Sequence, residues 1–303
     1  MMGRSVSSGS TRIARQLQII GSAILALLFL VAMLSTAAHA SAPPAPWTKR
    51  PLRVCADPND LPFSNRAQQG FENKLAQLVA SRMNTYVEYE WWPQRQKFLD
   101  NTLYAHHCDV VMGWAAHSDA VLTTKPYYRS AYAIVYRKSA SYDIRSLRDP
   151  LLRKLQIGVH AVGDDWFDLP GGAVLANRGI VKNVHVYTLF SNYGRPNPSA
   201  ELIEAVASGD VDVAIAWGPL AGYFAKYQPV DLVVVPLVNA HAKLPFEFSI
   251  SAAVRKGDTE LRDKLNRILE NNRDQINALL ASYNVPLLPL TDAEQHSKLA
   301  AAD

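Results

Sequence analysis

Residues 209–217 read GDVDVAIAW, and residues 108–114 read CDVVMGW. In each stretch an Asp opens a short apolar run, and a Trp stands five residues after that Asp. A short apolar run bounded by turn residues predicts a buried strand. The two stretches therefore predict equivalent strands in two similar halves of the chain. Each strand ends on a large aromatic side chain, Trp114 or Trp217, where it should leave the core.

Strands and helices alternate around these two stretches. In the first half we expect strands at 52–56, 86–92 and 109–114 and helices at 71–84 and 94–105. In the second half we expect strands at 155–160, 183–187, 211–217 and 231–236, helices at 163–177 and 199–208, and one long helix at 258–280. A βαβαβ order predicts a parallel sheet with right-handed crossovers.

Two extended segments, 131–137 and 246–254, flank the second half. We expect both segments to run between two lobes. The first lobe then consists of residues 51–137 plus 246–303, and the second lobe consists of residues 138–245. Open α/β sheets bind ligands beyond the C-terminal ends of their strands, so we expect a cleft between the lobes. The predicted fold class is α/β, a two-lobed periplasmic binding protein of type II, with two crossover strands and helices on both faces of parallel-type sheets.

Residues 1–40 have the pattern of a secretory signal peptide. Arg4, Arg12 and Arg15 form a positive segment, residues 19–34 are mostly apolar, and Ala38-His39-Ala40 offers a cleavage site. An uncleaved anchor is the competing interpretation, but the apolar run is short for a membrane span. We therefore expect cleavage near Ala40 and a periplasmic protein with no stable membrane span afterwards.

Removal of 40 of the 303 residues leaves 263, of which 41–50 form a Pro/Ala-rich tether. The formal net charge falls from +4 to +1, because the leader carries three arginines. No basic stripe interleaved with aromatic residues is present, so no nucleic-acid partner is expected.

The two cysteines, Cys55 and Cys108, predict a disulfide, because an even number in an exported chain favours pairing. Two buried free thiols are the alternative. No metal site is expected, since two cysteines without a spaced His pair do not complete a zinc shell. The adjacent His106 and His107 do not converge on one ion.

No motif of a hydrolase, metalloprotease, redox dithiol or phosphate-binding loop occurs. We therefore predict no catalytic residue, no cofactor and no enzymatic activity. An enzyme built on the same scaffold is the function that the sequence supports least, and Asp57 would be its only candidate for a catalytic residue.

Several blocks of the first half resemble a particular family. They are RVCADPNDLPFSN (53–65), GFENKLAQLVA (70–80), YEWWPQRQKFLDNTL (89–103), CDVVMG (108–113) and TTKPYYRSAYAIVYR (123–137). Together they resemble the quinoprotein-dehydrogenase-associated binding proteins of the MoxJ/XoxJ type. The resemblance implies the solute-binding-protein fold and an accessory or maturation role for a periplasmic, PQQ-dependent methanol dehydrogenase, which would be the partner.

Amino-acid-binding members of the wider class hold the ligand's carboxylate with an Arg and its ammonium with an Asp. Residues 113–128 contain no Arg, and His117 lies nearest the expected place. Trp217 stands where the Asp belongs. Since an unpaired buried charge is costly, a free amino acid is a poor candidate ligand.

The predicted cleft is instead suited to aromatic or apolar contacts. Several of its residues could instead have a purely structural role. The two tryptophans could be buried in the lobe cores, and Asp57 and Asn59 could form a turn in which they bond their own backbone. Arg129 could form an ion pair at the hinge. The turn is favoured for Asn59. The predicted cleft residues are Asp57, Phe63, Trp92, Trp114, His117, Tyr128, Arg129 and Trp217.

These observations predict an accessory protein that docks on the dehydrogenase. The alternative is an importer receptor for a small apolar or aromatic solute, lined by Trp114, Trp217 and Phe63.

Overall fold

The computed structural model describes residues 50–161, 169–189, 194–238 and 245–291. The predicted signal peptide and most of the predicted tether lie outside these ranges. Within them, no helix combines the length and the apolar character needed to cross a membrane.

The strands and helices alternate along the chain, as expected for an α/β protein. The strands are β1 (Leu52–Ala56), β2 (Asn59–Asp60), β3 (Ser64–Asn65), β4 (Val87–Trp91), β5 (Val110–Ala115), β6 (Leu122–Thr123), β7 (Tyr128–Arg137), β8 (Ile157–Ala161), β9 (Val184–Thr188), β10 (Val213–Trp217), β11 (Leu232–Pro236), β12 (Glu247–Val254) and β13 (Leu287–Leu288). The α-helices are α2 (Phe71–Arg82), α3 (Phe98–Asn101), α4 (Pro170–Asn177), α5 (Glu201–Ser208), α6 (Gly218–Lys226), α7 (Thr259–Asn271) and α8 (Arg273–Ser282).

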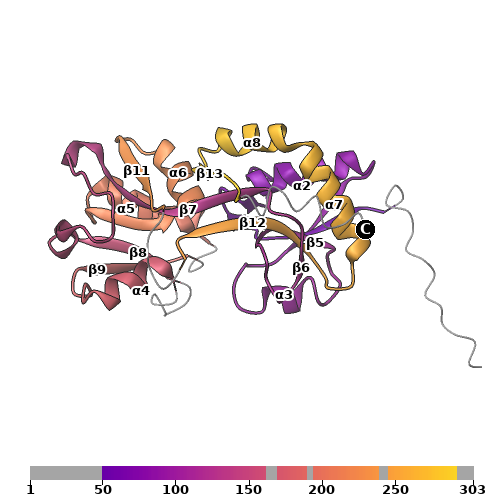
Figure 1. Ribbon diagram of the computed structural model, residues 1–303, viewed down its shortest axis with the longest axis horizontal. Helices are drawn as coiled ribbons and strands as arrows, with labels where there is room; N and C mark the ends of the chain where they lie inside the picture. Colours follow the sequence, from indigo (N-terminus) through magenta and orange to yellow (C-terminus); the bar gives the residue numbers. More distant parts are fainter. Residues whose placement is uncertain (1–49, 162–168, 190–193, 239–244, 292–303) are drawn as a thin grey trace, which may run out of the picture. The chain divides into compact units, whose positions relative to one another are not determined.

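The hydrogen-bonded strand order is β4-β1-β5-β12-β7-β10-β8-β9, with β11 and β13 also on β7 and β6 on β12. The predicted strands pair in parallel as β4-β1-β5 in the first lobe and as β10-β8-β9 in the second, whereas β11, predicted at 231–236, pairs antiparallel with β7. The long strands β7 and β12 pair antiparallel to each other and run between the two groups of elements (Figure 1). The sheets are therefore mixed, and the two-lobed α/β class is confirmed. The lobe boundaries given above stay a prediction.

Helices cover both faces of the sheet, because successive side chains of a strand point to opposite faces. In the second lobe, Ala133 and Val135 of β7 belong to the core cluster that includes buried residues of α5 and α6. Their neighbours Ile134 and Tyr136 face the other cluster, with Leu175 of α4. In the first lobe, buried residues of α2, α7 and α8 form one continuous core with residues of β1 and β5.

Helix α2 begins where the loop after β1 passes close to it. The backbone N–H groups of Phe71 and Glu72 donate to the carbonyl oxygens of Pro62 and Phe63, at 2.8 and 3.0 Å. A Cβ on Gly70 would lie 1.9 Å from the Phe63 carbonyl oxygen, so only glycine permits this approach. Residues 60–63 are thereby fixed against the start of α2.

Three helix predictions differ from the structure. The helix expected at 94–105 is reduced to α3, because Lys97 has the left-handed backbone value φ 63°, which an α-helix cannot contain. The single helix expected at 258–280 is two helices that meet at Asn272, whose side-chain amide donates to the Ile268 carbonyl oxygen at 2.7 Å. The helix expected at 163–177 is observed as α4, which begins at Pro170 after an extended N-cap residue, Leu169. Residues 163–168 of that prediction lie outside the described residues.

Helix α6 was not predicted. It follows β10 directly, with Trp217 as its N-cap and Pro219 in its first turn. Proline in the first helical turn is a known start signal, so the sequence did contain a clue to this helix.

Candidate functional site

A cavity of about 340 Å³ lies where β5 and β10 end. Both strands reach it through the tryptophan that closes them, Trp114 and Trp217. The other lining residues are Asp60, Phe63, Glu72, Gln94, Gly113, Ala115, Tyr128 and Ile250. A second cavity of about 260 Å³ shares Asp60, Phe63, Trp217 and Ile250 with the first, and continues along Tyr132, Leu189, Leu220 and Phe248. We call the two together the aromatic cleft.

Trp217 belongs to an aromatic cluster on the second-lobe side of the aromatic cleft. Its ring centroid lies 5.4 Å from that of Tyr132 and 5.8 Å from that of Phe248, in tilted and edge-to-face geometry. Tyr132 and Phe248 come from the crossover strands β7 and β12. On the other side, Phe63 meets the buried Phe71 edge to face at 5.4 Å. Such contacts hold the rings in fixed orientations at the cleft surface.

Four of the predicted cleft residues line the aromatic cleft: Phe63, Trp114, Tyr128 and Trp217. The structure brings them together from the loop after β1, from β5, from the start of β7 and from the end of β10. Whether they bind a ligand or a partner stays a prediction.

Asp57 is 1% exposed and is turned toward backbone groups. Its two carboxylate oxygens accept hydrogen bonds from the N–H groups of Asn59 and Gln94, at 2.8 and 2.7 Å. This geometry corresponds to the turn alternative. Asp57 is not among the residues that line either cavity.

The Asn59 side chain contradicts the expectation that it bonds its own turn. Its amide group donates to the Arg195 carbonyl oxygen at 2.8 Å, and its side-chain oxygen accepts from the Asn197 N–H at 3.0 Å. The Ser199 hydroxyl donates to the Leu61 carbonyl oxygen at 3.2 Å. These contacts tie the loop after β1 to the residues just before α5. Sequence reasoning missed them because the partners are 136 to 138 positions away.

The three remaining predicted cleft residues do not line the aromatic cleft. Trp92 follows β4 and is 37% exposed. His117 is exposed in the turn after β5 and has φ 60°. Arg129 forms an ion pair with Glu247 and donates to the Pro289 carbonyl oxygen. Because Glu247 lies on β12, this pair connects the two crossover strands, as the hinge alternative for Arg129 supposes.

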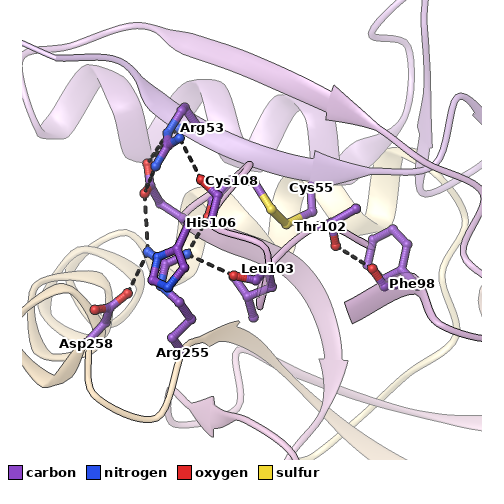
Figure 2. Close-up of a disulfide and its surroundings, with 10 residues drawn as sticks. Arg53, Cys55, Phe98, Thr102, Leu103, His106, Cys108, Arg255 and Asp258 are labelled. Atoms are coloured by element: carbon purple, nitrogen blue, oxygen red, sulfur yellow. Dashed lines mark hydrogen bonds and ion pairs between the residues drawn. A yellow bond between two sulfur atoms is a disulfide. The ribbon is translucent and has the colours of Figure 1, made fainter. Parts of the chain in front are cut away.

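The disulfide Cys55–Cys108 is present and joins β1 to the segment just before β5, as predicted (Figure 2). Its neighbourhood is held by Asp109, which accepts two hydrogen bonds from the Arg53 guanidinium at 2.8 and 3.2 Å. Burial alone would raise the pKa of Asp109, but the bonds and charge of Arg53 hold it below its ordinary value. Arg255 adds a bond to the Leu103 carbonyl oxygen at 3.1 Å (Figure 2). This cluster is structural and lies apart from the lining of the aromatic cleft.

Two acidic residues in the aromatic cleft were missed by sequence reasoning. Asp60 is 7% exposed, and burial together with the charge of Asp57 raises its pKa well above the ordinary value. Burial, and then the charge of Asp57, raises the pKa of Glu72 to about 8. The Glu72 carboxyl fits against Gly113, where an added Cβ would lie 1.9 Å from Oε1.

The sequence offered only a weak signal for these residues. Glu72 stands in the first turn of α2, where a carboxylate normally interacts with the helix dipole. Asp60 lies in a loop rich in Asp, Asn and Pro, which is typical of a turn. Asp60 and Glu72 therefore add acidic groups to the cleft at positions that the sequence analysis did not name. None of the described residues in the two cavity linings is an Arg.

Across the part of the chain that the structure describes, no three His, Cys, Asp or Glu side chains are grouped so as to hold a metal ion.

Comparisons with known proteins place this geometry in context. Residues 52–284 match the family of bacterial extracellular solute-binding proteins, family 3. The chain is 31% identical over 310 aligned positions to protein MoxJ of Methylorubrum extorquens, covering 95% of this chain and 100% of that one.

Two solved structures are similar as well. The periplasmic binding protein XoxJ from Methylobacterium extorquens AM1 is 37% identical with a TM-score of 0.66, covering 79% of this chain and 100% of that one. MxaJ from Methlophaga aminisulfidivorans MPT is 28% identical with a TM-score of 0.64, covering 78% of this chain and 100% of that one.

Proposed function

Because the chain belongs to the bacterial extracellular solute-binding proteins, family 3, we propose that it is exported to the periplasm and serves there as an accessory protein of a PQQ-dependent methanol dehydrogenase. The binding-protein fold would be adapted to bind the dehydrogenase rather than to deliver a solute to an importer. The observation that carries this proposal is the similarity to protein MoxJ over 95% of the chain. The same proposal includes cleavage of the leader near Ala40 and no catalytic activity or cofactor of its own.

The lining of the aromatic cleft supports this choice over a receptor for free amino acids. In the described part of the chain no Arg or Lys lines either cavity, so the carboxylate of an amino acid would find no cationic partner among these lining residues. Half-buried Trp114 and Trp217 offer large rigid surfaces, which are enriched where proteins bind other proteins. We propose that a segment of the dehydrogenase enters the aromatic cleft and contacts these rings.

A binding measurement with purified components tests the proposal. The exported chain is titrated with the methanol dehydrogenase of the same organism in an analytical ultracentrifuge, alongside Trp217→Ala and the matched control Tyr86→Ala. Tyr86 is an aromatic residue outside the cleft and is 61% exposed. We expect Trp217→Ala to weaken the complex about tenfold or more, as for a central aromatic anchor, and Tyr86→Ala to bind normally.

Deletion of the gene provides the second measurement. We expect a deletion strain grown on methanol to contain less active dehydrogenase. No complex at micromolar concentrations, together with normal dehydrogenase activity in the deletion strain, would exclude the accessory role. A rise in melting temperature with a small apolar solute, without dehydrogenase binding, would favour the importer receptor.

A further inference from the structure

Among the residues that the structure describes, the aromatic cleft contains two carboxyl groups and no basic side chain. Asp60 and Glu72 line the same cavity of about 340 Å³, and none of the described residues that share this lining is Lys or Arg. The charge of Asp57 acts on both of them. Within a protein interior, clustered carboxylates are stable as anions only when a cation is close.

Tyr128 lines the same cavity, and its hydroxyl lies close enough to Glu72 for the charge of that carboxyl group to act on it. Tyr128 is 3% exposed, yet its hydroxyl has no hydrogen-bond partner in the described ranges of the chain. The neighbouring Tyr127, by contrast, donates its hydroxyl hydrogen to the Met112 carbonyl oxygen at 2.9 Å. Glu72 likewise has no hydrogen-bond or ion-pair partner for its carboxyl group among those described residues. Since polar groups with little solvent exposure are usually paired, the Tyr128 hydroxyl and the partly buried Glu72 carboxyl are positioned for a group that enters the cavity.

The surrounding rings decide which kind of cation fits. Phe63, Trp114 and Trp217 line the cavity with the carboxyl groups, and aromatic faces attract ammonium and guanidinium groups. A metal ion would need a set of three or more ligands, which is not found in the described part of the chain. An alkyl stem would contact the rings while its charged end reached the carboxyl groups, as long basic side chains do.

We propose that the aromatic cleft binds an alkyl cation, an ammonium or guanidinium group, held by Asp60 and Glu72 with the Tyr128 hydroxyl as an additional acceptor. The same chemistry occurs in a free organic amine and in a Lys or Arg side chain of a protein. Assignment of the cation to the dehydrogenase rests on the proposed function, whereas the preference of the cavity for an alkyl cation does not.

Protonation of Glu72 gives this inference a measurable signature. With its pKa raised to about 8, Glu72 is largely neutral at pH 6, and a bound cation favours its ionised form. Binding therefore releases a proton below pH 8, and the affinity should rise about fiftyfold from pH 6 to pH 8. The titratable groups that act on or face Glu72 are Asp57, Asp60, Tyr89, Tyr127 and Tyr128.

Titration calorimetry with side-chain mimics tests the inference. The probes are N-acetyl-lysine amide and N-acetyl-arginine amide, with the neutral N-acetyl-norleucine amide as the matched control ligand. We expect the two cationic probes to bind and the neutral probe not to bind. Glu72→Gln and Asp60→Asn should each weaken binding at least about tenfold. Glu72→Gln should also reduce the rise in affinity between pH 6 and pH 8, and Glu260→Gln should change neither property.

A thermal melt of each variant in the absence of probe establishes that it is folded. Equal binding of the neutral and cationic probes, or an unchanged pH profile in Glu72→Gln, would overturn the inference.

Competition with the dehydrogenase separates the two sources of the cation. Displacement of the dehydrogenase by N-acetyl-arginine amide would assign the cation to a side chain of that partner. Binding of the amides without displacement would support the inference with a free amine as the ligand. Binding of the dehydrogenase without any binding of the amides would refute the inference and leave the proposed function standing.

Discussion

Replacement of Glu72 by Gln should make the protein more stable than wild type in alkaline buffer and leave it nearly unchanged in mildly acidic buffer. Burial and Asp57 raise the pKa of Glu72 from 4.5 in the unfolded chain to about 8 in the folded one. Between these two values the folded state binds about one proton more than the unfolded state. The free energy of unfolding of wild type therefore falls by about 1.4 kcal/mol for each unit that the pH rises.

The full interval from pH 4.5 to pH 8 corresponds to about 5 kcal/mol. Because the Glu72 side chain is only partly buried, water reduces this figure, and we expect a difference of about 2 to 4 kcal/mol at pH 9. Gln is neutral at every pH and similar in shape, so the two proteins should coincide near pH 5.

Urea unfolding followed by tryptophan fluorescence at pH 5 to 9 measures this difference. The matched control is Glu260→Gln, since Glu260 also stands in the first turn of its helix but is exposed. Its stability should stay within about 0.5 kcal/mol of wild type throughout. A constant difference between Glu72→Gln and wild type from pH 5 to pH 9 would refute the assignment of a raised pKa to Glu72.

Three further outcomes follow from other parts of the structure. The double variant Cys55→Ser/Cys108→Ser should lose about 4 kcal/mol of unfolding free energy in urea titrations, because the disulfide closes a separation of 53 residues; an unchanged midpoint would contradict this. Asn59→Ala should speed amide hydrogen exchange at Asn197 and lower the free energy of unfolding by about 1 to 3 kcal/mol, since two hydrogen bonds to distant backbone groups are lost. Unaltered exchange at Asn197 would argue against a role of these two hydrogen bonds in holding the loop. Burial lowers the pKa of His160 from 6.5 to about 4. The free energy of unfolding of wild type should therefore fall by about 3 kcal/mol more than that of His160→Gln between pH 6.5 and pH 4, because only the unfolded chain takes up this proton. Equal acid sensitivity of the two proteins would count against a buried neutral His160.

Much of the fold could be predicted from local patterns. The strand predicted at 52–56 is present with those bounds, and the strands expected at 109–114 and 211–217 differ from the structure by at most two residues at either end. The aromatic character of the cleft also followed from sequence, because Trp114 and Trp217 close one strand in each half and open α/β sheets place their ligand cleft at the C-terminal ends of such strands. Local backbone exceptions were not predictable: Lys97 enters the left-handed region, and Asn272 divides a run of helical periodicity that continues on both sides.

The acidic part of the site shows the limit of the sequence most clearly. Asp60 and Glu72 lie in a loop and in a helix start, and each has an ordinary local role there. They become neighbours in one cavity only because Gly70 lets the loop approach α2 and Gly113 leaves room for the Glu72 carboxyl.

The sequence by itself determined the alternation of strands and helices, the disulfide and the aromatic strand ends, because these depend on periodicity, composition and residues a few positions apart. Tertiary structure alone decided that two carboxyl groups and the Tyr128 hydroxyl meet among those rings. Burial and the electrostatic effect of Asp57 depend on distances through space, and those distances are fixed by how the loop, the helix and the two lobes pack.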